Sequence, residues 1–508
     1  MEQRSARDLR RGRRAKIMCT LGPATDGREA LEGLIRSGMD VARLNMSFGT
    51  PEEHLERIAR LRDVSKEVRG RPVAIVADLP GRKVRVRDLE DGGVHLETGA
   101  HLKLRADEGQ VGTSSDLPID RSLFSSGLMR GDTVFLADAV VELRVLDVGK
   151  DSADAEVVYG GDVRPHTGVH APGTHLSGSA ITDRDLPFMK LAVEEKLDYA
   201  ALTYVGDAVD VVEIRERFAD MGRDIPIIAK IERSEAFSRL DGILRRADAV
   251  MIRRGDLGAQ IEITRVPQVQ KEILRLAGQA GKPAIIATQM LSSMIDSPRP
   301  TRAEASDVSN AIADGADGVL LSSETAIGSY PVEAASMMAR IIGETEHEGV
   351  PFRRALPDGD PAVRAGFAHT TARIACEAAA QTQARLIVCF TESGRTARLV
   401  AKYRPFAPII AFCSNQETRR LLALNWGVRS DTLDVAGEVE VMVQRVEERL
   451  LGRKLVRDGD RVVIIFGAPV GERGHTNSVR LHVVGSNGTG TRDIPVIDGT
   501  SDLLQSIV

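Results

Sequence analysis

Short apolar runs of the kind that form β-strands recur through the first two thirds of this 508-residue chain, with helix-like segments between them. The eight runs span residues 16–20, 41–45, 73–78, 198–204, 225–231, 248–253, 283–288 and 317–322. Their apolar residues are continuous rather than alternating, as in strands that are covered on both faces. Eight strands, each followed by a helix, predict an α/β fold of the closed (β/α)8 TIM-barrel type.

A long insertion separates the third run from the fourth. Residues 78–198 are rich in Gly, Asp and Val, and turn signals separate strand-like pieces such as VHLETG and TVFLAD. We expect a small β-barrel domain here. Because the insertion follows the carboxyl end of the third strand, it lies at the functional face of the barrel and is placed to act as a lid.

The strand pattern restarts after residue 345. The pieces ARLIVCFT, PIIAFC and RVVIIFG are typical of buried strands and predict an open α/β domain at the C-terminal end. The expected parts are the barrel in two pieces, the lid, the C-terminal domain and a tail with a short docking helix. Their boundaries are 1–81 and 178–347 for the barrel, 82–177 for the lid, 348–487 for the C-terminal domain and 488–508 for the tail.

The net charge limits the classes of partner that fit this chain, and the cysteine spacing indicates its compartment. The formal net charge is only −5, so bulk electrostatics favour neither nucleic acid nor an anionic membrane surface. No apolar run approaches the ~18 residues that a membrane helix needs. Cysteines 19, 376, 389 and 413 lack metal-type spacing and indicate buried thiols in a reducing compartment. We therefore expect a cytoplasmic protein without nucleic-acid or membrane partners.

Polar residues end several of the eight runs, where a barrel of this kind carries its functional groups. They are Arg43, Asn45, Ser47, Asp78, Lys230, Glu232, Arg254, Gly255, Asp256, Thr288, Gln289, Ser322 and Glu324. Glu232 and Asp256 offer the hard oxygens that Mg²⁺ prefers. Lys230 points to the same side as Glu232 and supplies a cation for a transferring phosphoryl group. The residues alone equally allow a buried structural ion pair of Lys230 with Glu232.

Longer stretches of the sequence resemble the pyruvate kinase family across nearly the whole chain. The matching stretches are RRAKIMCTLGPA (13–24), GMDVARLNMSFG (38–49), IIAKIE (227–232), RGDLG (254–258), ATQMLSSM (287–294), PTRAEASDVSNAIADGADGVLLSSETAIGSYP (300–331), SGRTARLVAKYRP (393–405) and GHTNSVRLHVV (474–484). The resemblance implies phosphoryl transfer from phosphoenolpyruvate to ADP, giving ATP and pyruvate. It also implies Mg²⁺ or Mn²⁺, a mobile lid, an allosteric site in the C-terminal domain, and a homotetramer.

The resemblance assigns roles on the phosphoenolpyruvate side of the site. Glu232 and Asp256 would hold the divalent metal together with the substrate. Lys230 would neutralise the phosphoryl charge and stabilise the enolate, which is electrostatic stabilisation of the kind that dominates many enzymes. Arg43 would hold the phosphate.

Further roles follow from the same resemblance. Arg254 and Gly255 would contribute to the backbone N–H groups that bind the substrate carboxylate, and glycine permits a close approach there. Thr288 would help to protonate the enolate through water. Arg85 would span both substrates, and Phe48 lies at the nucleotide.

The monovalent-cation site also has counterparts here. The matching residues are Asn45, Ser47, Asp78 and Leu79. Lys83, in DLPGRKVR, stands where the family has a glutamate that accompanies potassium dependence. A fixed ammonium there would replace the monovalent ion, and we predict activity without added K⁺. The alternative is that Lys83 is a solvated residue of the lid hinge.

Several departures alter the acceptor side of the site. Phe48 replaces a histidine, and TGVHAPG (167–173) carries Thr167 and His170 in place of a lysine and an asparagine. Arg253 replaces alanine, and Ser323 replaces glycine. Arg253 either clamps an additional anionic group on the substrate, or its side chain points away and pairs with an acid. These changes leave two alternatives to a working pyruvate kinase: a relative with another phosphoryl acceptor, or a metabolite-sensing homologue with weak activity.

The C-terminal domain contains a candidate effector loop. Its residues are Thr391, Ser393, Gly394, Arg395 and Thr396. Hydroxyl groups, a glycine and a following helix N-terminus form an anion site. In some members of the family this loop binds a phosphorylated effector. The alternative is a helix cap, in which Ser393 or Thr391 satisfies backbone N–H groups.

Overall fold

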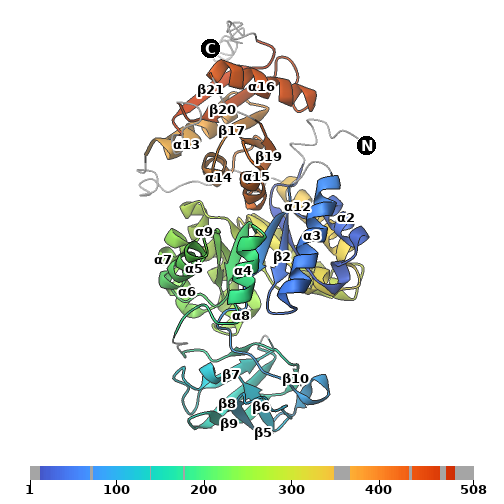
Figure 1. Ribbon diagram of the computed structural model, residues 1–508, viewed down its shortest axis with the longest axis vertical. Helices are drawn as coiled ribbons and strands as arrows, with labels where there is room; N and C mark the ends of the chain where they lie inside the picture. The colour runs from blue at the N-terminus through green and yellow to red at the C-terminus, as the bar shows by residue number, and fades with distance from the viewer. Residues whose placement is uncertain are drawn as a thin grey trace, which may run out of the picture.

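The computed structural model describes residues 12–68, 72–137, 139–174, 178–347, 366–433, 438–468 and 476–486. Three parts follow one another along the long axis of the molecule, with a β domain at one end, a barrel in the middle and an α/β domain at the other end (Figure 1). The expected tail at 488–508 lies outside the described residues.

Eight parallel strands close the barrel in the order β1-β16-β15-β14-β13-β12-β3-β2, which confirms the predicted fold class. They are β1 (Lys16–Leu21), β2 (Val41–Asn45), β3 (Ala74–Asp78), β12 (Tyr199–Leu202), β13 (Ile227–Ile231), β14 (Ala249–Arg253), β15 (Ala284–Ala287) and β16 (Gly318–Leu321). Each coincides with a predicted run to within two residues. Nearly all strand residues are buried, because helices cover one face and the barrel interior the other.

Helices form the outer ring of the barrel. They are α2 (Arg28–Ser37), α3 (Pro51–Glu67), α4 (Leu186–Glu194), α5 (Ala208–Asp220), α7 (Leu240–Arg246), α9 (Val266–Ala280), α10 (Arg302–Ala313) and α12 (Pro331–His347). Capping boxes define three of the starts, Thr50 with Glu53 in α3, Asp207 with Asp210 in α5 and Thr301 with Glu304 in α10. Two short helices, α8 (Arg254–Gly258) and α11 (Ser323–Ala326), directly follow barrel strands and lie at the carboxyl ends.

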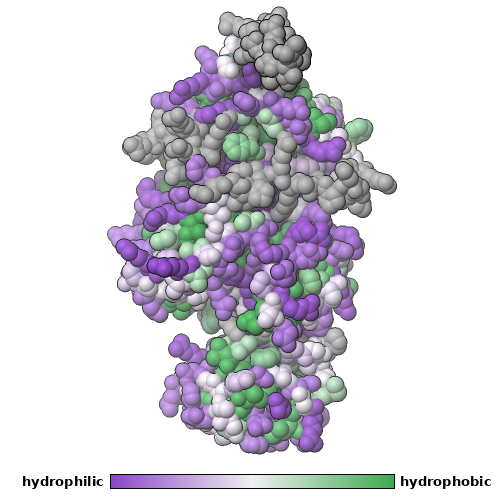
Figure 2. Space-filling view, turned by 180° about the vertical axis from the view of Figure 1, so that it is seen from behind, coloured by the Kyte–Doolittle hydropathy of each residue, from purple (hydrophilic) through white to green (hydrophobic). Residues whose placement is uncertain are grey.

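The insertion folds as an all-β domain. Its strands are β4 (Val94–Leu96), β5 (His101–Ala106), β6 (Asp116–Ile119), β7 (Thr133–Leu136), β8 (Val141–Val148), β9 (Ser152–Tyr159), β10 (Gly161–Val163) and β11 (Val169–His170). Six form a sheet in the order β11-β7-β8-β9-β5-β6, and β10 pairs with β4. The domain has its own apolar core, and the molecule narrows where it meets the barrel (Figure 2). This β domain is therefore a separate body at the carboxyl ends of the barrel strands, as a lid requires.

The C-terminal domain is an open α/β sheet. Its elements are α13 (Gly366–Gln381), β17 (Leu386–Phe390), α14 (Arg395–Lys402), β18 (Ile409–Cys413), α15 (Gln416–Leu421), a 3₁₀ turn η6 (Leu422–Leu424), β19 (Val428–Thr432), α16 (Val439–Gly452), β20 (Arg461–Phe466) and β21 (Ser478–Val483). The strand order is β19-β18-β17-β20-β21, and only the edge strand β21 runs antiparallel to its neighbour.

This domain closes the amino-terminal end of the barrel. The Tyr199 hydroxyl at the start of β12 donates to the Leu421 carbonyl oxygen at 2.7 Å, and Arg404 pairs with Asp317 at 2.7 Å, next to β16. Leu424 of η6 belongs to the apolar cluster that fills the barrel interior. The C-terminal domain therefore packs on the end of the barrel opposite the β domain.

The sequence predicted buried thiols and no membrane helix. All four cysteines are free thiols, with Cys19, Cys389 and Cys413 buried and Cys376 half-buried. Among the helices of the described residues, none combines the length and the apolarity that a membrane crossing requires.

Candidate active site

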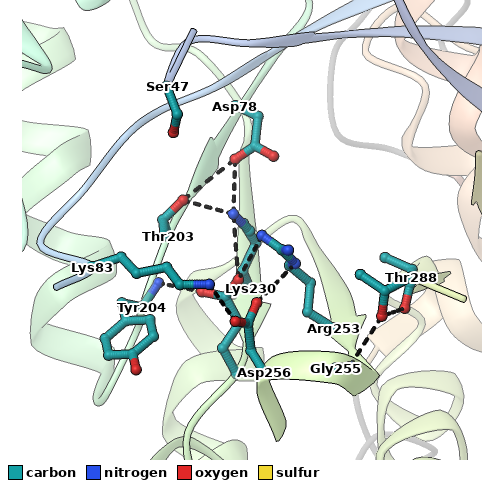
Figure 3. A network of polar contacts seen from close by, with 12 residues as sticks. Ser47, Asp78, Lys83, Thr203, Tyr204, Lys230, Arg253, Gly255, Asp256 and Thr288 are labelled. Carbon is teal, nitrogen blue, oxygen red and sulfur yellow. Dashed lines mark hydrogen bonds and ion pairs between the residues drawn. The ribbon is translucent and has the colours of Figure 1, made fainter. Parts of the chain in front are cut away.

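The carboxyl ends of the barrel strands bring five predicted charged residues together, and Asp78, Lys230 and Asp256 are labelled in Figure 3. Arg43 lies on β2, Asp78 ends β3, Lys230 lies on β13, Glu232 follows β13, and Asp256 lies in α8 after β14. The side chains of Glu232 and Asp256 are 0% exposed, and that of Lys230 is 2% exposed. Lys230 Nζ lies 3.4 Å from Glu232 Oε1, as the two-residue spacing along a strand predicts.

Hydrogen bonds fix the Lys230 ammonium in place. Its Nζ donates to Thr203 Oγ1 at 2.7 Å and to Asp78 Oδ1 at 3.0 Å. The other Asp78 oxygen accepts from Arg43 Nε at 2.6 Å. Burial alone would raise the pKa of Asp78, but the charges of Lys230 and Arg43 outweigh it and hold that pKa well below its usual value. Asp78 is therefore a carboxylate that orients two cations toward the mouth of the barrel.

Arg253 bridges the two predicted metal ligands. Its Nε lies 3.0 Å from Asp256 Oδ2, and its Nη1 lies 3.4 Å from Glu232 Oε1. Arg253 thus pairs with acids, as one of its two expected arrangements had it, but its side chain turns into the site rather than away from it. Burial alone would raise the pKa of Asp256, but Arg253 and Lys83 outweigh it and hold that pKa well below its usual value.

The two carboxylates suit a divalent ion. Glu232 Oε1 and Asp256 Oδ2 are buried and accept no hydrogen bond from any described residue, although buried oxygens are normally hydrogen-bonded. No group of three or more His, Cys, Asp or Glu side chains in the described part of the chain is arranged to hold a metal. Mg²⁺ commonly takes one or two carboxylates from a protein and completes its shell with substrate oxygens and water. Glu232 Oε1 and Asp256 Oδ2, which both lie next to Arg253, supply the kind and number of ligands that Mg²⁺ commonly takes from a protein.

The β domain and its hinge contribute directly to the site. Lys83 pairs with Asp256 Oδ1, and His170 Nε2 lies 3.0 Å from the same oxygen. The other ring nitrogen of His170 is hydrogen-bonded to the Tyr204 hydroxyl at 2.8 Å. Burial lowers the pKa of Lys83, and Asp256 opposes that shift. In this arrangement the lid is closed onto a carboxylate of the barrel.

The residues expected at a monovalent cation lie at the carboxyl ends of β2 and β3. The Asn45 side-chain oxygen accepts from the backbone N–H of Ser47 at 3.3 Å, and the Leu79 carbonyl accepts from Thr203 Oγ1 at 2.6 Å. Asp78 is held by its two cations. The structure places the Lys83 ammonium on Asp256 rather than on Asp78, so it does not lie among these residues.

A strained turn follows β15. Thr288 and Gln289 have φ values of 74° and 54°, a backbone region that residues other than glycine rarely occupy. Thr288 Oγ1 accepts from the backbone N–H of Gly255 at 3.1 Å, which ties this turn to α8. Arg254 donates to the Thr288 carbonyl oxygen at 2.8 Å and pairs with Asp307 at 2.7 Å. Arg254 therefore holds the turn, and the Thr288 hydroxyl is positioned at the site.

Two residues were expected at the nucleotide. Arg85 donates to the His166 carbonyl oxygen at 2.9 Å and to Ser47 Oγ at 3.2 Å, so it connects the β domain to the loop after β2. Phe48 in that loop is 56% exposed. Of the other substituted positions, Thr167 accepts from the Val86 N–H through its carbonyl oxygen. Ser323 begins α11.

The candidate effector loop lies in the C-terminal domain, between β17 and α14, and not near the barrel mouth (Figure 1). Gly394 is the N-cap residue of α14 with a φ of 79°, and no side-chain hydrogen bond caps this helix. The cap by Ser393 or Thr391 is therefore not formed. Thr396 Oγ1 is hydrogen-bonded to Thr476 Oγ1 at 2.8 Å.

Sequence reasoning missed two residues that follow β12. Thr203 supports Lys230, and the Tyr204 backbone N–H donates to Glu232 Oε2 at 2.7 Å. Tyr204 also has a positive φ of 62°. Thr203 could have been found from the sequence, because its hydroxyl lies at the carboxyl end of the fourth apolar run. Thr288 was selected for the same reason at the end of the seventh run.

Comparisons with known proteins agree with this geometry. A model of the pyruvate kinase barrel domain matches residues 12–335, and a model of the pyruvate kinase alpha/beta domain matches residues 369–482. The pyruvate kinase of Geobacillus stearothermophilus is 39% identical over 475 residues, which cover 93% of this chain and 80% of the relative. That of Bacillus licheniformis is 38% identical over 476 residues, which cover 93% and 81%.

A solved structure extends the likeness to three dimensions. A pyruvate kinase from Cryptosporidium parvum superposes with a TM-score of 0.83 at 32% identity, covering 94% of this chain and 97% of the other. Both domain models, the bacterial relatives and this structure agree, and the chain belongs to the pyruvate kinase family.

Proposed function

We propose that this chain is a working pyruvate kinase that transfers the phosphoryl group of phosphoenolpyruvate to ADP. The bond between phosphorus and the enol oxygen breaks while a bond forms to a terminal oxygen of ADP. The enolate that remains takes a proton at its methylene carbon and becomes pyruvate. The observation that carries the proposal is the buried grouping of Lys230, Glu232 and Asp256 beneath the lid, in a chain of this family.

Glu232 and Asp256 would hold Mg²⁺ or Mn²⁺ through their buried oxygens. When bound, the ion supplies positive charge to the oxygens of the substrate. The support comes from the donor set, which consists of two hard carboxylate oxygens without hydrogen-bond donors among the described residues. His170 and Lys83 contact Asp256 from the lid side, so closure of the lid completes the surroundings of that ligand.

Lys230 and Arg43 would bind and neutralise the phosphoryl group. The Thr203 hydroxyl and Asp78 hold Lys230 in a buried position, where a fixed charge acts more strongly than in water. Lys230 would also stabilise the enolate. The Gly255 segment would bind the substrate carboxylate, and the Thr288 hydroxyl would direct a water-mediated proton to the enolate carbon.

Release of pyruvate tests this function. Purified protein with Mg²⁺ and phosphoenolpyruvate is expected to release pyruvate rapidly with ADP and hardly at all without it. Release that is metal-dependent but requires an acceptor other than ADP would point to the substitutions at Phe48, Thr167 and His170 and would contradict the proposal. No release with any nucleoside diphosphate would refute the proposal.

Potassium independence is a second expectation, because Lys83 adds a buried ammonium to the site, where it pairs with Asp256 rather than with the residues expected at the monovalent cation. Turnover with Mg²⁺ is expected to be the same in KCl and in tetramethylammonium chloride of equal ionic strength. Lys83→Glu is expected to lower turnover and make it respond to K⁺, since the ammonium is replaced by a carboxylate. Lys103→Glu, an exposed residue of β5, is the matched control. A wild-type protein that needs K⁺ as co-activator would refute this expectation.

Other expectations stay proposals that family membership supports. These are a cytoplasmic location, a homotetramer, a phosphorylated effector at residues 391–396, and the domain boundaries given above. The ranges of the two family models leave residues 336–368 between them, which is compatible with a boundary near 347. Light scattering of the purified protein would test the tetramer.

A further inference from the structure

The guanidinium of Arg253 contacts the two oxygens that a divalent ion would use. Arg253 Nε lies 3.0 Å from Asp256 Oδ2, and Nη1 lies 3.4 Å from Glu232 Oε1. Among the described residues, Arg253 alone contacts both carboxylates. A cation placed between two buried acids weakens their attraction for a further cation, and Glu232 Oε1 already has Lys230 Nζ at 3.4 Å as well.

Arg253 is held there differently from the neighbouring cations. Lys230 is fixed by hydrogen bonds to Thr203 and Asp78. Neither Glu232 Oε1 nor Asp256 Oδ2 accepts a hydrogen bond from a described residue, so the contacts of Arg253 with these two oxygens are ion pairs without hydrogen-bond geometry.

Arg253 reaches the two acids from a partly exposed side. Its side chain is 21% exposed, whereas those of Glu232 and Asp256 are 0% exposed. It is the last residue of β14, and its side chain turns inward toward Asp256 (Figure 3). A guanidinium that reaches buried acids from a partly open side can leave these two oxygens by side-chain rotation.

We propose that Arg253 is a displaceable counter-ion that competes with the divalent metal for Glu232 and Asp256 and thereby sets the metal affinity. The inference rests on the metal site of the proposed function. The metal must displace the guanidinium, so part of its binding free energy is spent on breaking two ion pairs. An anionic substrate offers the displaced guanidinium a new partner. Metal and phosphoenolpyruvate therefore strengthen each other's binding by the same factor, as linkage requires.

Direct binding of Mn²⁺ tests the competition without any turnover. The signal of free Mn²⁺ in electron paramagnetic resonance is titrated against wild-type protein and Arg253→Ala, both without substrate. Arg253→Ala is expected to bind Mn²⁺ about tenfold more tightly, because the competing charge is gone. Arg239→Ala removes an equally positive, exposed side chain that pairs with Asp207, and it is expected to bind as the wild type does.

The substrate supplies a second readout. Phosphoenolpyruvate is expected to strengthen Mn²⁺ binding more in the wild type than in Arg253→Ala. Arg253→Met, which keeps the length of the side chain without its charge, repeats both measurements if the alanine variant loses its native circular dichroism. Equal or weaker Mn²⁺ binding in the folded variant, with normal binding in the wild type, overturns this inference alone. Absence of Mn²⁺ binding in every variant overturns the proposed metal site as well.

Discussion

A Lys230→Met variant is expected to fold like the parent protein and to lose at least about a thousandfold in turnover of phosphoenolpyruvate with ADP. Methionine keeps the length and the apolar stem of lysine but cannot neutralise a phosphoryl group or an enolate. The ammonium lies in a buried position fixed by Thr203 and Asp78, so bulk solvent cannot replace its charge. Asp78 keeps Arg43 as a partner and Glu232 keeps Arg253, so the remaining acids are not left without cations.

The measurement pairs steady-state kinetics with two checks of integrity. Far-UV circular dichroism and Mn²⁺ binding are expected to be retained, because the fold and the two metal-binding carboxylates are unchanged. Lys190→Met, an exposed residue that pairs with Glu194 on α4, is the matched control and should keep full activity. A folded Lys230→Met protein with nearly wild-type turnover would show that the ion pair of Lys230 with Glu232 is only structural.

The eight barrel strands could be predicted because each is buried on both faces and therefore appears as an unbroken apolar run. The same logic placed Lys230 beside Glu232, since alternate residues of a strand share a face. Asp256 could be placed at the same rim because strands that run parallel end at one edge. These features follow from local pattern and from the direction of the chain.

Side-chain direction was harder to predict, because it depends on partners from distant segments. Arg253 had two possible orientations until the positions of Glu232 and Asp256 were known. Lys83 was expected at the monovalent-cation residues, yet its ammonium reaches Asp256, 173 positions further along the chain. Tyr204 has a positive φ that no residue preference indicates. The contact of Lys83 depends on how the lid docks on the barrel, and the contacts of Arg253 depend on how β13, β14 and α8 meet at the barrel rim, which local sequence does not encode.

Among single substitutions in the site, Asp78→Asn is expected to lower the stability of the protein most. Asp78 is 1% exposed, and its two oxygens bind Lys230 and Arg43. An amide is nearly the same size but carries no charge, so two buried cations lose their shared counter-ion. Removing one partner of a buried ion pair costs about 3–5 kcal/mol, which for a domain of this size corresponds to a fall in the barrel Tm on the order of 10 °C.

Calorimetry of two aspartate variants tests whether the fall in Tm comes from the burial of Asp78 or simply from the loss of one negative charge. Asp224→Asn removes the same charge from a barrel residue whose side chain is 80% exposed and lies 3.3 Å from Arg215. Exposed pairs of this kind contribute about 0–1 kcal/mol, so the control should shift the Tm by only a few degrees. Equal shifts in the two variants would mean that Lys230 and Arg43 find other partners when Asp78 is neutral. Asp78 would then be unnecessary for holding the cations that face the phosphoryl group.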